Sequence, residues 1–278
     1  VENLDLKFDT DEGRITAVDN VSFELNSGEV LGLVGESGSG KSVTAKSLMH
    51  LNPSNAVYGS GSEIYLELDH DVVDVLSLKS SRELKIVRGG AISMIFQEPM
   101  ASFAPAITIG AQMVEQLLIH TSLSKKEAAE LSVEMLERVG ISEAGHRFYQ
   151  YAFELSGGMR QRAAFLRTVL AEKDVVLLDE PFGALDALTR AQMQEWLLDL
   201  WSSFRKTIVL VTHDVEEAVL LSDRVYVMTA RPGKVKAVLP VRLPRPRQYE
   251  VITTETFVAI KGQVMAELRG QPLRAADE

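Results

Sequence analysis

A glycine-rich loop between an apolar strand and a helix constrains this chain more than any other feature. Residues 35–42 read Gly-Glu-Ser-Gly-Ser-Gly-Lys-Ser, directly after the apolar stretch 30–34. The glycines let several backbone N–H groups converge on one anion, and the helix that follows adds the positive end of its dipole. In loops with this spacing the lysine reaches the β- and γ-phosphates and the serine ligates Mg²⁺. The flanking strand and helix disfavour an accidental Lys-Ser turn, so Lys41 and Ser42 predict a nucleoside triphosphate site. We call residues 35–42 the phosphate loop.

The composition limits the classes of protein that remain. The chain has 278 residues, 46% of them apolar, which permits one large α/β domain or a core with an inserted subdomain. Its net charge of −10 argues against a broad nucleic-acid-binding face, and the absence of cysteine excludes disulfides and thiolate metal sites. The apolar runs are shorter than the roughly 18 residues of a membrane span, so we expect membrane association only through a partner. The first residues show no basic-then-apolar pattern, so we expect no signal peptide among them, and the true N-terminus stays open.

The order of hydrophobic patterns predicts a mostly parallel sheet with helices on both faces. Buried strands at 175–178, 207–212 and 224–229 alternate with helices that begin at Asp186 and Asp214. Residues 98–157 show no strand pattern and are predicted to be a helical insertion, with a capping box at Ser124. Further strands are expected at 4–8, 21–25, 64–68, 72–75 and 91–96, and a helix at 41–51. Residues 244–247 read as a stiff linker before an amphipathic last helix.

Two carboxylates end a buried strand. Asp179 and Glu180 follow the uninterrupted apolar run 175–178. Open parallel sheets bind ligands at the carboxyl ends of their strands, so both acids are expected beside the phosphate loop. There Asp179 would ligate Mg²⁺ or hold its water shell, and Glu180 would act as general base on the attacking water. The four apolar residues before them disfavour a merely solvated strand end.

Two more polar residues end predicted strands, and a serine–glycine cluster begins a helix. His213 follows strand 207–212, where it would hold the γ-phosphate and the attacking water in line. Gln97 ends strand 91–96, and its amide would ligate Mg²⁺ or the water. Residues 155–161, Leu-Ser-Gly-Gly-Met-Arg-Gln, place an anion-receptive turn at a helix start. Taken alone the histidine is more often structural, and its assignment depends on the shared sheet edge. The turn alone is only a helix cap, and it becomes specific together with the phosphate loop and the strand that ends in Asp179 and Glu180.

Together these motifs resemble the ATP-binding cassette (ABC) ATPases over nearly the whole chain. The matches occur in the family's order: the phosphate loop, the Q-loop at Gln97, the signature segment 155–161, the strand ending in Asp179 and Glu180, the D-loop 184–186 and the switch histidine His213. Phe8 stands where the family has an aromatic residue that stacks on adenine, with Phe here in place of the commoner Tyr. Met159 stands where the signature segment more often has Gln.

The resemblance implies a fold, a set of ligands and a set of site residues. The fold is a P-loop NTPase core at 1–97 and 158–240, with an N-terminal antiparallel β subdomain, an inserted α-helical subdomain at 98–157, and a C-terminal linker and helix at 241–278. The implied ligands are ATP and Mg²⁺, with the metal at Ser42, Gln97 and Asp179. The implied catalytic residues are Glu180, His213, Gln97 and Lys41. ATP would contact Phe8, Gly35, Glu36, Ser37, Gly38, Ser39, Gly40, Lys41, Ser42 and Val43.

The family also implies partners. Two cassettes would face each other head to tail with two ATP molecules between them, so Ser156, Gly157, Gly158 and Met159 would serve the partner's nucleotide and Asp186 would lie at the dimer interface. The sequence leaves open whether the second cassette is the same chain. Residues 97–120 would receive the permease subunits, which work with an extracytoplasmic solute-binding protein. The chain would then be a peripheral subunit at the cytoplasmic face of the membrane, without a nucleic-acid partner.

The substrate has two readings, because the two ends of the chain resemble different importers. Up to about Pro105 the chain is similar to oligopeptide and nickel importer ATPases, as in Met94-Ile95-Phe96-Gln97-Glu98-Pro99. From Leu155 it is similar to the nitrate, sulfonate and taurine importers, as in the segments 178–186, 212–218 and 243–247. The lack of cysteine favours a small anion or a pyrimidine-like solute, with a peptide or nickel as the alternative. A soluble ABC ATPase of DNA repair or translation and a nonhydrolysing regulatory cassette are the rival classes.

Overall fold

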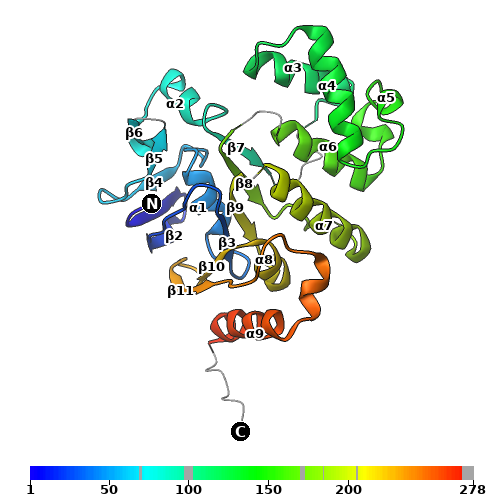
Figure 1. Cartoon of the computed structure of the whole chain (residues 1–278). Coiled ribbons are helices and arrows are strands. Elements are labelled where there is room, and N and C mark those ends of the chain that lie inside the picture. Colours follow the sequence, from blue (N-terminus) through cyan, green and yellow to red (C-terminus); the bar gives the residue numbers. More distant parts are fainter. Residues whose placement is uncertain (69–70, 97–102, 170–172, 184, 205, 271–278) are drawn as a thin grey trace.

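A sheet with the strand order β11-β10-β3-β9-β8-β7 lies at the centre of the computed structural model (Figure 1), which describes residues 1–68, 71–96, 103–169, 173–183, 185–204 and 206–270. Its strands are β3 (Val30–Val34), β7 (Ile92–Ile95), β8 (Val175–Asp179), β9 (Thr207–Thr212), β10 (Arg224–Met228) and β11 (Val235–Pro240). All neighbours are parallel except β10 and β11. The predicted architecture, a mostly parallel sheet with a separate antiparallel β subdomain, is confirmed.

Successive residues of each central strand pack on opposite faces of this sheet, because side chains alternate along a strand. Val30, Leu178 and Leu210 lie in an apolar cluster with helices α7 (Ala187–Phe204), α8 (Val215–Leu221) and α9 (Glu255–Arg269). Leu31 and Val209 lie in the other cluster, with helix α1 (Lys41–Ser47) and the small sheet β2-β1-β4. That sheet is antiparallel and consists of β1 (Leu4–Thr10), β2 (Gly13–Val21) and β4 (Ala56–Tyr58). Both faces are thus covered, which explains the all-apolar strands.

A separate apolar cluster belongs to the helices at the upper right of Figure 1. They are α3 (Ile109–His120), α4 (Lys125–Arg138), α5 (Ala144–Arg147) and α6 (Gly157–Val169). The predicted capping box is present, since Ser124 accepts from the N–H of Glu127 and Glu127 accepts from the N–H of Ser124. Helix α4 ends before Gly140, whose φ of +71° suits glycine. The division of the chain at 98–157 remains our proposal.

Several boundaries differ from the predicted ones. The strand predicted at 21–25 is wrong, because β2 ends at Val21 and the Phe23 N–H donates to the carbonyl of Val1 outside any ladder. Helix α1 ends at Ser47 rather than near Leu51, since His50 has a positive φ of 52°. Strands β5 (Tyr65–Leu68) and β6 (Asp71–Asp74) form close to the predicted 64–68 and 72–75 and pair in antiparallel fashion. Helix α2 (Ser81–Val87) and the short helical turns η1 (Val75–Ser77), η3 (Ala152–Glu154) and η4 (Tyr249–Thr253) were not predicted.

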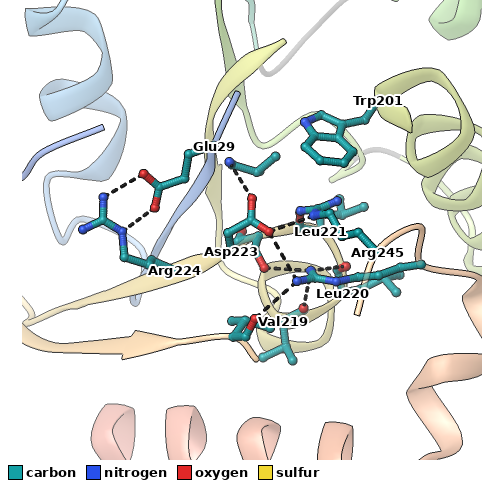
Figure 2. Close-up of polar contacts among 12 residues, drawn as sticks. Glu29, Trp201, Val219, Leu220, Leu221, Asp223, Arg224 and Arg245 are labelled. Atoms are coloured by element: carbon teal, nitrogen blue, oxygen red, sulfur yellow. Dashed lines mark hydrogen bonds and ion pairs between the residues drawn. The ribbon is translucent and has the colours of Figure 1, made fainter. Parts of the chain in front are cut away.

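The segment predicted as a linker, 244–247, is instead anchored to the core (Figure 2). Arg247 is buried and donates to the carbonyls of Leu220 (2.9 Å) and Ser222 (2.7 Å), which have no partner within helix α8. Arg245 donates to Asp223 Oδ1 at 2.8 Å, and its guanidinium lies 3.7 Å from the centre of the Trp201 ring. These contacts anchor the segment that leads to helix α9, and Phe257, Ile260 and Val264 of that helix pack in the same apolar cluster as helix α8. The last helix therefore packs on the body of the protein.

Candidate functional site

The phosphate loop leaves β3 and curls into helix α1 through backbone conformations that suit glycine. Gly38 and Gly40 have φ of +80° and +82°, which residues with a Cβ rarely adopt. A Cβ on Gly40 would also lie 2.8 Å from the carbonyl oxygen of Ala17. The glycines of this motif are therefore required both by the turn and by the close approach of strand β2.

Lys41 is buried beneath the phosphate loop, and its ammonium holds the loop closed. Its Nζ donates to the carbonyls of Gly35 (2.8 Å) and Glu36 (2.9 Å) and to Ser39 Oγ (3.3 Å). Burial lowers the pKa of Lys41, while the nearby carboxylates of Glu180 and Asp179 act in the opposite direction. A bound polyphosphate can replace these neutral acceptors with charged ones, which form stronger bonds to an ammonium.

Ser42 and Asp179 meet at the sheet edge, as predicted from the sequence. Ser42 Oγ donates to Asp179 Oδ1 at 2.6 Å. Burial raises the pKa of Asp179, and the hydrogen bond from Ser42 partly offsets this effect. A hydroxyl and one carboxylate fit Mg²⁺, because this ion is usually held by one or two protein oxygens together with phosphates and waters. Such a site needs no larger cluster, and none is found among the described residues.

Glu180 and His213 face each other beside Asp179. His213 Nδ1 lies 3.1 Å from Glu180 Oε2. Glu180 has a positive φ of 47°, an uncommon and strained conformation for a residue with a side chain. Its backbone N–H donates to the carbonyl of Val211 in β9, which holds this conformation in place. The strained backbone and the histidine both fix the direction of the carboxylate.

A cleft of about 460 Å³ lies beside the phosphate loop. It is lined by the predicted residues Phe8, Lys41 and Glu180, among others. Phe8 of β1 and Ile15 and Ala17 of β2 form an aromatic and apolar wall next to the phosphate loop. The lining also contains residues that the sequence did not indicate: Thr10, Ile15, Ala17, Pro53, Asn55 and Arg231. These come from β1, β2, the 53–55 turn and the β10–β11 loop, and no local motif marks them.

The signature segment and Asp186 do not line this cleft. Ser156 caps helix α6, accepting from the N–H of Met159 at 3.3 Å, and both Ser156 and Gly157 are exposed. Asp186 caps helix α7 in the same way, and hydrogen bonds from Thr189 lower its pKa. Gln97 and residue 184 of the D-loop lie outside the described residues. A single chain thus brings the phosphate loop, Asp179, Glu180 and His213 together, without the signature segment.

A buried acid that the sequence did not indicate lies behind His213. Glu217 accepts a hydrogen bond from Thr212 Oγ1 at 3.1 Å, and burial together with Asp214 raises its pKa to about 8. Asp214 accepts from the N–H groups of Glu216 (2.8 Å) and Glu217 (3.2 Å) and so caps helix α8. Near neutral pH a protonated Glu217 therefore supports the turn that carries His213.

Glu217→Gln is expected to change how stability depends on pH. Folding raises the pKa of Glu217 from its ordinary value of 4.5 to about 8. The contribution of Glu217 to the free energy of unfolding is therefore greatest below pH 4.5 and is lost as the pH rises through 8. Between pH 6 and pH 8 the wild type should lose about 2 kcal/mol of unfolding free energy relative to the variant, at about 1.4 kcal/mol per unit. Urea unfolding of both chains at the two pH values measures this difference. Parallel pH curves for the two proteins would contradict the burial of a protonated acid.

Comparison with known proteins gives consistent matches. The family model described as "ABC transporter" matches residues 18–183. The chain is 41% identical to the oligopeptide transport ATP-binding protein OppD of Escherichia coli, covering 98% of this chain and 80% of that protein. It is 40% identical to the dipeptide transport ATP-binding protein DppD of Bacillus subtilis, covering 83% and 67%.

Solved structures agree with these sequence matches. The dimeric structure of MJ0796, described as a bacterial ABC transporter cassette, is 26% identical with a TM-score of 0.72, covering 87% of this chain and 98% of that one. A post-hydrolysis dimer of the same cassette with ADP and Pi aligns equally well. Within the described ranges, none of the helices combines the length and hydropathy that a bilayer span requires.

Proposed function

We propose that this chain, which belongs to the ABC transporter family as an ATPase that binds MgATP, powers the import of oligopeptides or dipeptides. The observation that carries the proposal is the 41% identity to OppD of Escherichia coli along 98% of this chain. Other similar proteins are also named as dipeptide or oligopeptide transport ATPases. The relatives thus favour the peptide alternative over the small anion that the C-terminal motifs indicated. Those motifs are weak guides, because an ATPase subunit powers transport without itself enclosing the solute.

The chemistry follows from the groups at the sheet edge. The attacking water would lie between Glu180 and the γ-phosphate, and it would lose a proton to the Glu180 carboxylate as its oxygen bonds to phosphorus. The bond from phosphorus to the oxygen shared with the β-phosphate then breaks, and ADP keeps that oxygen. His213 would hold the γ-phosphate in line, and Lys41 would leave the Gly35 and Glu36 carbonyls to bind the β- and γ-phosphates.

Other predicted residues have supporting roles. Ser42, Asp179 and Gln97 would hold Mg²⁺, which supplies compensating charge for the phosphates. Phe8 would place its π-face against adenine. Asp186 would lie near the second cassette.

A second cassette would complete the site. The signature segment is exposed at the start of helix α6 and does not line the cleft of its own chain, and MJ0796 is described as dimeric. One chain carries both an intact phosphate loop and an intact signature segment, so two copies suffice to form two complete sites. We propose that Ser156, Gly157, Gly158 and Met159 of each copy close over the ATP of the other.

An exposed aromatic surface on the helical region supports a permease contact. Phe153 and Tyr149 are 67% and 73% exposed. The rings of Tyr151 and Phe153 are stacked, with their centroids 5.5 Å apart. The bridge between Thr108 and Tyr151 places this surface beside the exposed Ile107, within the predicted contact region 97–120. Clustered exposed aromatic residues are typical of protein interfaces. Through this contact the chain would be held as a peripheral subunit at the cytoplasmic face of the membrane.

Solute uptake in cells tests the proposal. Cells that depend on this chain and its neighbouring permease should accumulate labelled dipeptides or oligopeptides, and should not take up taurine or nitrate through it. Phe153→Asp should abolish uptake and membrane retention while the purified chain still hydrolyses ATP. Val258→Asp, at an exposed position on helix α9, is the matched control and should leave uptake unchanged. Uptake of the anions instead of peptides, or full peptide uptake with Phe153→Asp, would contradict the corresponding part of the proposal.

A further inference from the structure

The loop between β10 and β11 brings a cation to the nucleotide cleft. Residues 231–234 read Arg-Pro-Gly-Lys, and Arg231 lines the cleft together with the phosphate loop, Phe8 and Glu180. Its guanidinium lies near Gly38 of the phosphate loop. A Cβ added to Gly38 would have Arg231 Nη2 as its nearest neighbour, at 4.0 Å.

The backbone of this loop is fixed between the phosphate loop and strand β2. The N–H of Gly233 donates to the carbonyl of Ala17 at 3.0 Å, and the N–H of Asp19 donates to the carbonyl of Gly233 at 2.9 Å. Gly233 also packs so closely on Ser39 that an added Cβ would lie 2.1 Å from the Ser39 carbonyl oxygen. The position of Arg231 beside the cleft is therefore set by the fold rather than by a freely moving loop.

Arg231 differs from the neighbouring cations in its contacts. It makes no hydrogen bond or ion pair with any residue in the part of the chain that the structure describes, whereas Lys234 on the same loop pairs with Asp19 at 2.7 Å. Lys41 already donates to three acceptors inside the phosphate loop. The cleft must also accept a highly charged polyphosphate close to the carboxylate of Glu180. An unpaired guanidinium at this place is suited to bind phosphate oxygens through two parallel bonds.

We propose that Arg231 is a nucleotide-binding residue that contacts the phosphate chain of ATP and ADP from its position near Gly38. It supplies affinity rather than chemistry, since it lies at the cleft wall and the reacting groups are Glu180 and His213. Because the contact is electrostatic and exposed, it weakens as the salt concentration rises.

Competition binding tests this assignment with three variants of the full chain. Labelled ADP is displaced by ADP, ATP and inorganic tripolyphosphate, each with Mg²⁺, at low salt. Arg231→Ala should weaken all three by about tenfold, the usual scale of a charge-assisted hydrogen bond. Arg231→Lys should recover part of the affinity, because it keeps the charge without the planar fork. Lys234→Ala, which loses only the ion pair with Asp19, is the control and should bind as the wild type does.

The outcomes separate this inference from the ATPase assignment. If the wild type binds ATP and Arg231→Ala binds all three competitors within a factor of two, the inference fails and the assignment stands. A loss limited to ADP and ATP, with tripolyphosphate unaffected, would mean that Arg231 contacts the nucleoside and would overturn the phosphate contact. A change only in pairing of the cassettes, with unchanged binding by the single chain, would also overturn it.

Discussion

Glu180→Gln is expected to lower ATP turnover by about 10²–10⁴-fold, the usual contribution of a general base, while ATP binding persists. Glutamine keeps the shape of the side chain and a hydrogen-bonding oxygen for His213, which lies 3.1 Å away in the wild type. It cannot accept a proton from water at neutral pH. Phosphate release under saturating MgATP measures turnover, and displacement of labelled ADP measures binding.

A matched control separates the loss of a base from the loss of a charge. Glu250→Gln removes the same charge at an exposed position on η4, away from the cleft, and should leave turnover unchanged. Turnover of Glu180→Gln at the wild-type rate would rule out this residue as the base.

Lys41→Ala is expected to weaken ATP binding by at least about 100-fold, because two charge-assisted bonds to phosphates are lost. The wild-type ammonium lies at the centre of the phosphate loop, where it already holds the carbonyls of Gly35 and Glu36. Removing it also leaves those carbonyls without this donor, so the loop loses its shape as well as its charge. Titration calorimetry with MgATP measures the change.

The same experiment needs a control for folding and for net charge. Lys85→Ala removes an exposed lysine from helix α2 and should bind ATP as the wild type does. The thermal unfolding of Lys41→Ala should remain cooperative. ATP binding by a folded Lys41→Ala chain with wild-type affinity would exclude the phosphate loop as the nucleotide site.

The groups at the sheet edge could be placed from the sequence because they obey local rules. The phosphate loop is a continuous motif, and Asp179, Glu180 and His213 each follow a short apolar strand. Since the carboxyl ends of parallel strands share one edge, the sequence pattern alone brings these side chains together. The signature segment obeys a local rule too, but the role that we propose for it depends on a second chain.

Other features depend on contacts between distant segments, which local patterns do not reveal. Arg231 reaches the cleft because Gly233 pairs with Ala17, more than two hundred residues earlier in the chain. Arg247 can be buried because carbonyls at the end of helix α8, which lack partners within the helix, accept hydrogen bonds from its guanidinium. Glu217 resembles a solvated acid in the first turn of a helix, where carboxylates are common, yet the fold buries it. In each case tertiary packing changed the environment of a residue whose sequence context looked ordinary.

We propose that two cassettes pair over ATP, and sedimentation of the Glu180→Gln chain measures this pairing. The slow variant keeps ATP intact, so its mass with MgATP reports whether a second copy closes over the nucleotide. We predict that MgATP doubles the mass, and that adding Ser156→Arg to the same chain prevents the doubling while ATP still binds. A single-chain mass with ATP bound would rule out this pairing, and pairing that persists with Ser156→Arg would rule out the signature segment as the part that closes over ATP.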